Sequence, residues 1–221
     1  MIMWDMDIVY EFLPRLWSGL IITVEVTILA TLLALVYGLV MAVLERSPAA
    51  PVRRLVGMIL EFVRRTPPLI QLYFAFYVLP SIGFMLDGFT CGVIVMGIHI
   101  GSYMAEVYRS GIDAVDKGQW EAACALNYGK GDTWRFIILP QAILPMIPAL
   151  GNYLVLMFKD SALLSTITVL DMMGETVVFA NSSYHYLEPM TIVGIVYLLI
   201  SIPCAFGLRA LEKSLNKNPQ S

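Results

Sequence analysis

Charged residues are scarce in this sequence. Only 14% of its 221 residues are Asp, Glu, Lys or Arg, whereas a soluble domain has roughly 25%. Hydrophobic residues make up 58% of the chain. This balance excludes an ordinary water-soluble domain and indicates a protein of the lipid bilayer. The formal net charge of -3 is too small to indicate a nucleic-acid partner.

Residues typical of catalytic and metal sites are also few. The three cysteines, Cys91, Cys124 and Cys204, lie far apart without metal-ligand spacing, and there are two histidines. No Gly-x-x-x-x-Gly-Lys-Ser/Thr loop occurs, so we do not expect this chain to bind ATP itself. An intramembrane enzyme is not expected. Uphill transport would therefore need energy from another subunit.

Five apolar stretches are long enough to cross a membrane, since a span needs about 20 mainly apolar residues. We therefore predict an all-α membrane protein with five transmembrane helices. Residues 1–17 mix Trp, Tyr and acidic residues, which predicts an interfacial N-terminal segment. Residues 213–221 are expected to form a cytoplasmic tail. The expected spans, within a transmembrane region at 18–212, are residues 16–44, 55–85, 89–110, 136–159 and 189–211.

Prolines interrupt two of these spans. Thr66-Pro67-Pro68 predicts a break in the second, because proline lacks an N–H and clashes with the preceding turn. Pro140, Pro145 and Pro148 predict a kinked fourth span. Residues 160–188 are too long for a simple connection. We expect Asp171–Tyr186 to form a short helix and turn, with Asn181-Ser182-Ser183 as the turn residues. Ser161–Leu170 either lies at the membrane surface or enters the membrane as a re-entrant segment. Lipid cannot satisfy its backbone, so protein must cover it.

Positive side chains lie between alternate spans. The loop at 45–54, the segment at 109–135 and the C-terminal residues contain Lys and Arg, whereas 86–88 and 160–188 contain neither. Cytoplasmic loops are enriched in these residues. The pattern predicts a cytoplasmic C-terminus and an N-terminus outside.

Charged residues near the ends of spans are predicted to pair. Glu61 lies three and four residues before Arg64 and Arg65, and Glu106 lies three before Arg109, so each can meet its partner on one helix face. Such pairs would anchor helix ends. The set is Glu61, Arg64, Glu106, Arg109, Lys159 and Asp160; the last two are adjacent and need not pair with each other.

Other polar residues lie at membrane depth, where each needs a partner or a function. Glu25 has no obvious local partner, and His99 lies near the middle of the third span. Each residue of this group either lines a substrate path or bonds a neighbouring helix. The substrate-path candidates are Glu25, Gln71, His99, Ser102 and Asn152.

A polar segment at about 111–139 separates the third and fourth spans and is longer than a connection requires. Gly118 is expected to break it. The residues that follow, Gln119–Leu126, are good helix formers. Asn127 then stands where a left-handed helix end is expected, a conformation that Asn tolerates.

This segment carries a family resemblance. Glu121-Ala122-Ala123, Asn127 six positions after the glutamate, and Leu139-Pro140 together resemble the EAA loop of bacterial ABC-importer permeases. Glu61–Pro67 and Tyr103–Gly111 are similar to patterns in the polar amino-acid branch of that family, although Arg65 and Asn127 stand where the family usually has Gly.

The resemblance implies a MetI-like permease in a bacterial inner membrane. A second permease subunit, identical or different, would pair with it, and ABC ATPase subunits would bind ATP and Mg²⁺. A periplasmic or lipid-anchored binding protein would deliver the solute. The chain itself would need no cofactor. The residues implied to contact the ATPase are Gly118, Glu121, Ala122, Ala123 and Asn127.

The implied solutes are polar amino acids or related small zwitterions. Two alternatives stay open: import of a compatible solute such as ectoine or hydroxyectoine, and a membrane scaffold subunit that does not conduct. An ion channel is not favoured, because the sequence has no filter-like segment or ring of pore charges.

Overall fold

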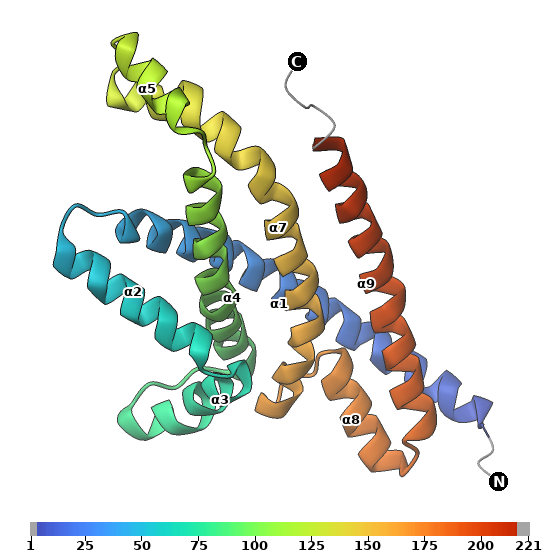
Figure 1. Ribbon diagram of the computed structural model, residues 1–221. Helices are drawn as coiled ribbons and strands as arrows, with labels where there is room; N and C mark the ends of the chain where they lie inside the picture. The colour runs from blue at the N-terminus through green and yellow to red at the C-terminus, as the bar shows by residue number, and fades with distance from the viewer. Residues whose placement is uncertain (1–3, 216–221) are drawn as a thin grey trace.

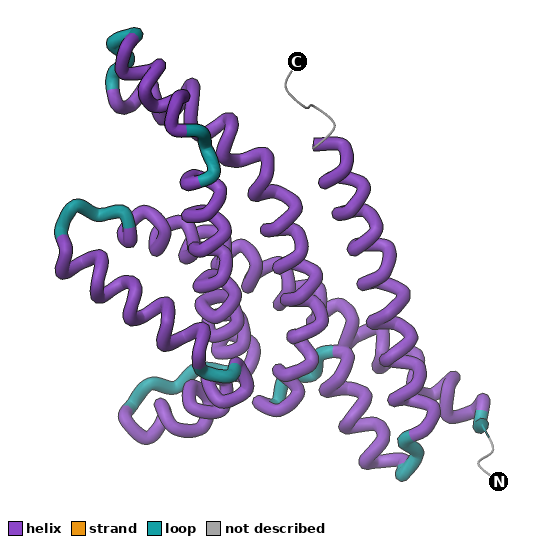
Figure 2. Tube along the Cα trace, viewed as in Figure 1, coloured by secondary structure: helices purple, strands orange, loops and turns teal. Residues whose placement is uncertain are grey.

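A computed structural model describes residues 4–215, and this part of the chain forms helices and contains no strand (Figure 2). Four helical segments are long and apolar enough to cross a membrane. They are Met6–Glu45, Gly88–Asp113, Lys130–Ile167 and Leu187–Leu215. The predicted all-helical fold is confirmed, whereas the second predicted span, residues 55–85, does not form one long helix.

The elements follow one another along the chain with short connections (Figure 1). In order they are α1 (Met6–Glu45), α2 (Ala50–Arg65), α3 (Pro68–Tyr73), η1 (Phe74–Val78), η2 (Leu79–Ile82), α4 (Gly88–Asp113), α5 (Lys117–Ala125), α6 (Lys130–Asp132), η3 (Thr133–Ile138), α7 (Leu139–Asp160), η4 (Ser161–Ile167), α8 (Met172–Ser183) and α9 (Leu187–Leu215).

The N-terminal segment is part of α1 and is not separated from it. Asp5 caps the helix by accepting the N–H of Asp7 at 2.9 Å. Phe12 is fully buried, and its ring centroid lies 5.2 Å from that of Phe179 on α8. The boundary predicted at residue 17 is therefore not a break in the structure, because the apolar face of the helix continues toward its start. Residues 1–3 of that predicted segment lie outside the described part.

Small residues bring α1 and α4 into backbone contact. Ala30, Ala34 and Gly38 recur every four residues on α1 and are buried. Gly101 on α4 meets this stripe so closely that an added Cβ would lie 2.9 Å from the carbonyl oxygen of Ala34. A Cβ on Gly38 would lie 2.7 Å from the carbonyl oxygen of Gly101. In lipid, where burial against water does not drive helix association, close packing of this kind holds helices together.

The second predicted span is divided at the expected place. Thr66 caps the C-terminus of α2, and Pro68 begins α3. The apolar run that follows, Pro68–Ile82, is shorter than a full span. Helix α2 buries only Val56 and Leu60. The predicted span at 55–85 is thus an amphipathic helix followed by a short apolar segment.

The segment between α7 and α9 folds back into the protein. Its largest buried side chains are Leu164, Ile167, Met172 and Phe179, so protein covers it, as predicted. The turn, however, was predicted wrongly at Asn181-Ser182-Ser183. The hydroxyls of Ser182 and Ser183 both donate to the carbonyl of Phe179 and hold the last turn of α8. The chain reverses at Tyr184 instead, with φ of 60°.

Helix α9 lies at one side of the molecule (Figure 1) and contacts α7 as far along as Leu208, whose side chain meets Gly151. Its buried residues, Glu188, Pro189 and Val193, all lie near its start. Farther along, Leu199 and Phe206 are 66% and 63% exposed. The helix continues to Leu215, so the predicted tail at 213–221 begins as helix, and residues 216–221 lie outside the described part.

Different helices lie at the two ends of the molecule. Helix α5 and the C-terminal end of α9 lie toward one end, and the start of α1 and α8 lie toward the other (Figure 1).

Helix α7 continues through Pro145 and Pro148 and has Pro140 in its first turn, where a missing N–H costs least.

Candidate functional site

A pocket of about 420 Å³ lies between α2, α4 and α7. Two of its lining residues are oppositely charged, Arg64 and Glu106, and two are aromatic, Tyr103 and Tyr153. A concave site that mixes apolar walls with a few charged groups is typical of small-molecule binding.

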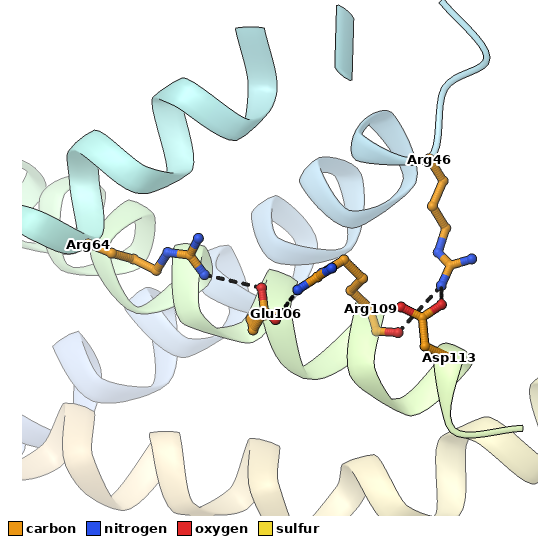
Figure 3. Close-up of polar contacts among 5 residues, drawn as sticks. All are labelled: Arg46, Arg64, Glu106, Arg109 and Asp113. Atoms are coloured by element: carbon orange, nitrogen blue, oxygen red, sulfur yellow. Dashed lines mark hydrogen bonds and ion pairs between the residues drawn. The ribbon is translucent and has the colours of Figure 1, made fainter. Parts of the chain in front are cut away.

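Glu106 lies between two guanidinium groups (Figure 3). Its Oε2 accepts from Nη1 of Arg64 at 3.3 Å, and its Oε1 accepts from Nη2 of Arg109. Arg109 is on the same helix, one turn away, as the spacing suggested. Arg64 comes from α2, so the carboxylate joins two helices at the edge of the pocket.

The polar contacts continue to the end of α4. Arg46, which follows α1, donates through Nη2 to Asp113 Oδ1 and, at 3.4 Å, to the backbone carbonyl of Arg109 (Figure 3). Asp113 is the last residue of α4, four residues before α5 begins. Charged contacts therefore run from the pocket almost to α5.

Aromatic rings form one wall of the pocket. Tyr103 stacks on Tyr153 with centroids 6.0 Å apart, and His99 meets the edge of Tyr103 at 5.5 Å. The Tyr103 hydroxyl donates to the carbonyl of Arg64 at 3.1 Å. These contacts fix α4 against both α2 and α7.

Gln71 and His99, two predicted substrate-path residues, are brought together. The Oε1 atom of Gln71 lies 3.3 Å from His99 Nδ1. The Gln71 amide also donates to the carbonyls of Val63 and Thr66, at 2.7 and 2.9 Å. Gln71 thus satisfies backbone groups left open where α2 ends, a role that sequence alone did not suggest.

The other path candidates are dispersed. Ser102 is buried and donates to the carbonyl of Ile98 at 2.9 Å. Glu25 and Asn152 are exposed, on α1 and α7. None of these three side chains lines the pocket between α2, α4 and α7.

The predicted charge pairs divide into separate groups. Glu61 contacts Arg65 at 2.5 Å, one of its two expected partners. Arg64 turns instead to Glu106, 42 residues away. Lys159 is exposed and Asp160 half-buried, and no ion pair involves either within residues 4–215.

Helix α5 begins and ends with local caps. The Gly118 N–H donates to the side chain of Asp116 at 2.6 Å, so Gly118 lies in the first turn and does not break the helix as we expected. At the other end Asn127 has φ of 59°. The N–H groups of Asn127 and Tyr128 donate to the carbonyls of Cys124 and Ala123, both at 3.0 Å. This pattern is a Schellman ending, which asparagine permits.

One face of α5 packs on η3, with one further contact from the start of α7, and the other face is open. Ala123 is buried, and Trp120 meets the ring of Trp134 edge-on at 5.2 Å. Gln141 on α7 donates to Gln119 at 3.2 Å. The exposed face contains Glu121, Ala122 and Leu126, and Leu126 is 71% exposed.

Metal binding finds no support in the side-chain arrangement. Within residues 4–215, no three His, Cys, Asp or Glu side chains gather closely enough to hold an ion.

Comparison with known proteins covers most of the chain. The family described as "Binding-protein-dependent transport system inner membrane component" matches residues 13–217. Over 207 residues the chain is 40% identical to the probable amino-acid ABC transporter permease protein y4tG of Sinorhizobium fredii, covering 94% of this chain and 90% of that one. It is 31% identical over 207 residues to the arginine transport system permease protein ArtQ of Bacillus subtilis, covering 93% and 94%.

Solved structures agree. A crystal structure of an amino acid ABC transporter with histidines matches with a TM-score of 0.91 and 33% identity, covering 96% of this chain and all of that chain. An inward-facing MetNI methionine ABC transporter matches with a TM-score of 0.79 at 17% identity, which shows the shared fold alone. The chain therefore belongs to the family of binding-protein-dependent transport system inner membrane components, as a permease subunit of an amino-acid ABC transporter.

Proposed function

We propose that this subunit forms a translocation path by which an ATP-driven importer brings a polar amino acid into the cell. The observation that carries this proposal is the pocket between α2, α4 and α7, where Arg64 and Glu106 face one cavity. The relatives named for amino-acid transport support the substrate class.

The pocket offers partners for both charged groups of an amino acid. A guanidinium binds a carboxylate through paired N–H donors, and a carboxylate accepts from an ammonium group. Arg64 contacts Glu106 by one bond of 3.3 Å, which is long for a charge-assisted contact. A passing zwitterion replaces this contact by bonding to both partners, with Tyr103 and Tyr153 beside its side chain.

The open face of α5 docks onto the ATPase subunit. ABC permeases are not enzymes themselves, and ATPase activity lies in a separate subunit, which we expect to bind ATP and Mg²⁺. Ala122 lets a partner approach closely, and Glu121 offers it a charged acceptor. Because Trp120 and Gln119 tie α5 to the start of α7, a push on α5 moves α7, whose Tyr153 lines the pocket.

The arrangement in the membrane follows from charge. We propose five crossings, with Pro68–Ile82 completing the second, the N-terminus outside, and α5 and the C-terminus in the cytoplasm. A second permease subunit covers the apolar face of α9, which is exposed in the single chain. An extracytoplasmic binding protein delivers the solute at the end that contains α8.

The alternative of ectoine or hydroxyectoine import is not favoured, since the matched relatives include permeases named for amino acids, arginine and glutamine. A scaffold that does not conduct is separated from a permease by measuring flux directly.

The deciding experiment is uptake into proteoliposomes that contain this chain with its ATPase, partner permease and binding protein. A panel of labelled arginine, histidine and glutamine, with ectoine for comparison, is tested with and without ATP. Arg64→Gln should lower uptake, and the neighbouring Arg65→Gln should not, because Arg65 pairs with Glu61 outside the pocket. Equal uptake by both variants would argue against the pocket. ATP hydrolysis without flux of any solute would favour the scaffold.

The path candidates outside the pocket are tested separately. Glu25→Leu and His99→Leu should change which amino acids are carried. Glu25 lies on an exposed face that a second subunit can meet, and His99 contacts Tyr103, which lines the pocket. If uptake of every solute stays unchanged, both side chains serve only the structure.

A further inference from the structure

A second cavity, of about 940 Å³, lies on the other side of α4 from the pocket. It is bounded by the end of α1, by α4, and by η3 with the first turns of α7. Its α4 residues, Tyr108 and Ile112, point away from Tyr103 and Glu106, which line the pocket. The two cavities share Met146 as a wall.

The walls of this groove are apolar along most of its length. Leu39 and Val43 come from α1, and Leu139 and Ile143 come from the start of α7. Val43 is 62% exposed and Ile143 is 47% exposed in the single chain. A groove of this kind between membrane helices suits a hydrocarbon chain.

The groove ends in positive charge. Arg46 and Ser47 form its mouth, and Arg53 approaches the same place by donating to the carbonyl of Ser47 at 3.2 Å. Trp134 also lines the groove. Tryptophan is enriched at the level of lipid headgroups, and basic pockets between helices on the cytoplasmic side bind anionic headgroups.

Asp113 neutralises Arg46 only in part. Both contacts that the guanidinium makes use Nη2, to Asp113 and to the carbonyl of Arg109. A guanidinium has five N–H donors, so Nε and Nη1 can still bind a phosphate. The Asp113 side chain is 56% exposed and can turn toward water.

We propose that this groove binds one anionic phospholipid, with an acyl chain along Leu39, Val43 and Ile143 and its phosphate at Arg46. A second copy of this chain, docked groove to groove, would place its own Arg46 and Arg53 against these cations, which disfavours that occupant. This proposal rests on the membrane arrangement proposed above, but it does not depend on which solute is carried.

The test identifies the occupant by photo-crosslinking. The photoreactive residue p-benzoylphenylalanine replaces Val43 in the full transporter, reconstituted in vesicles of phosphatidylglycerol and phosphatidylcholine with identical acyl chains. The same residue at Ile21, exposed on α1 far from the groove, is the control. Adducts are identified by mass spectrometry.

We expect phosphatidylglycerol to be enriched about fivefold over its vesicle share at position 43, the effect of one cation near the surface, and not at position 21. Arg46→Gln should remove the enrichment. Asp113→Asn breaks the same ion pair but keeps the cation, so it should preserve or raise the enrichment. Adducts at the vesicle ratio in the unaltered groove, or an adduct to protein, would overturn the proposal.

Discussion

Glu106 Oε2 lies 3.3 Å from Arg64 Nη1, and this contact joins α4 to the last turn of α2. The other oxygen of the same carboxylate contacts Arg109. One acidic side chain therefore holds two cations at the edge of the pocket. Without it, both guanidinium groups would lose their charged partner at a partly buried site.

Glu106→Gln should lower ATP-dependent uptake by roughly tenfold to a hundredfold, which is the effect of losing one or two charge-assisted hydrogen bonds. The control is Glu61→Gln, which removes an exposed pair with Arg65 and should leave uptake nearly unchanged. Transport of a labelled amino acid into proteoliposomes measures both. Similar losses in the two variants would mean that helix anchoring explains the effect, and that the pocket does not.

Substitutions at two neighbouring alanines on α5 should affect the protein differently, one through partner binding and the other through stability. Ala122 is exposed, so Ala122→Leu should leave the fold intact and weaken co-purification of the ATPase with the permease. Ala123 is buried, so Ala123→Leu should cost about 1–3 kcal/mol through overpacking. Thermal unfolding in detergent separates the two. An Ala122→Leu variant that keeps its ATPase and its uptake would place the docking surface elsewhere.

The same Gly→Ala substitution should have opposite effects on stability at two positions. Gly101→Ala places a methyl group 2.9 Å from the carbonyl oxygen of Ala34 and 2.8 Å from a ring carbon of Tyr37, so it should destabilise the protein by about 1–3 kcal/mol. Gly207→Ala meets nothing within 4 Å and should stabilise α9 by about 0.5–1 kcal/mol. Thermal unfolding of the purified variants gives the sign of each change, and equal shifts would contradict the packing seen between α1 and α4.

Asp171 predicts a dependence of stability on pH. Burial raises the pKa of its carboxyl group to about 6, and the hydrogen bond that it accepts from the Gly174 N–H lowers this pKa only in part. Between pH 4 and 6 the folded protein therefore keeps a proton that the unfolded chain has lost. Stability contributed by this group should fall by about 3 kcal/mol as pH rises through that range, and stay level above it.

Asp171→Asn tests this, because the amide oxygen can still cap α8 but does not titrate. We expect the melting temperature of the variant to rise relative to that of the original protein as the pH increases from 4 to 6.5. Parallel curves over the whole range would mean that the carboxyl group ionises normally in the folded protein.

Local chemistry made part of this structure predictable. The positive φ of Asn127 and the end of α2 at Thr66 depend on residues within a few positions, since Asn tolerates the left-handed region and proline cannot continue a helix. The caps by Asp5 and Asp116 depend on equally short distances along the chain. The Glu-Ala-Ala segment could be placed on a helix for the same reason.

Contacts between distant helices could not be predicted in this way. The pairing of Arg64 with Glu106 depends on which faces of α2 and α4 meet, and a single sequence does not reveal this. The continuation of α1 before residue 17 depends on Phe12 packing against Phe179. The bonds from the Gln71 amide to the carbonyls of Val63 and Thr66, where α2 ends, could not be predicted either.

The contact between Gly38, Gly101 and Ala34 has a mechanical consequence. Backbones in direct contact cannot slide past each other without a steric clash, so we infer that α1 and α4 move as one rigid unit. In the importer that we propose, alternating access would then arise from parts that contact this rigid unit less closely. Helix α7, which carries three prolines, and α9, whose buried residues all lie near its start, are those parts. In the proposed importer, this rigid unit would be the frame against which the other helices move.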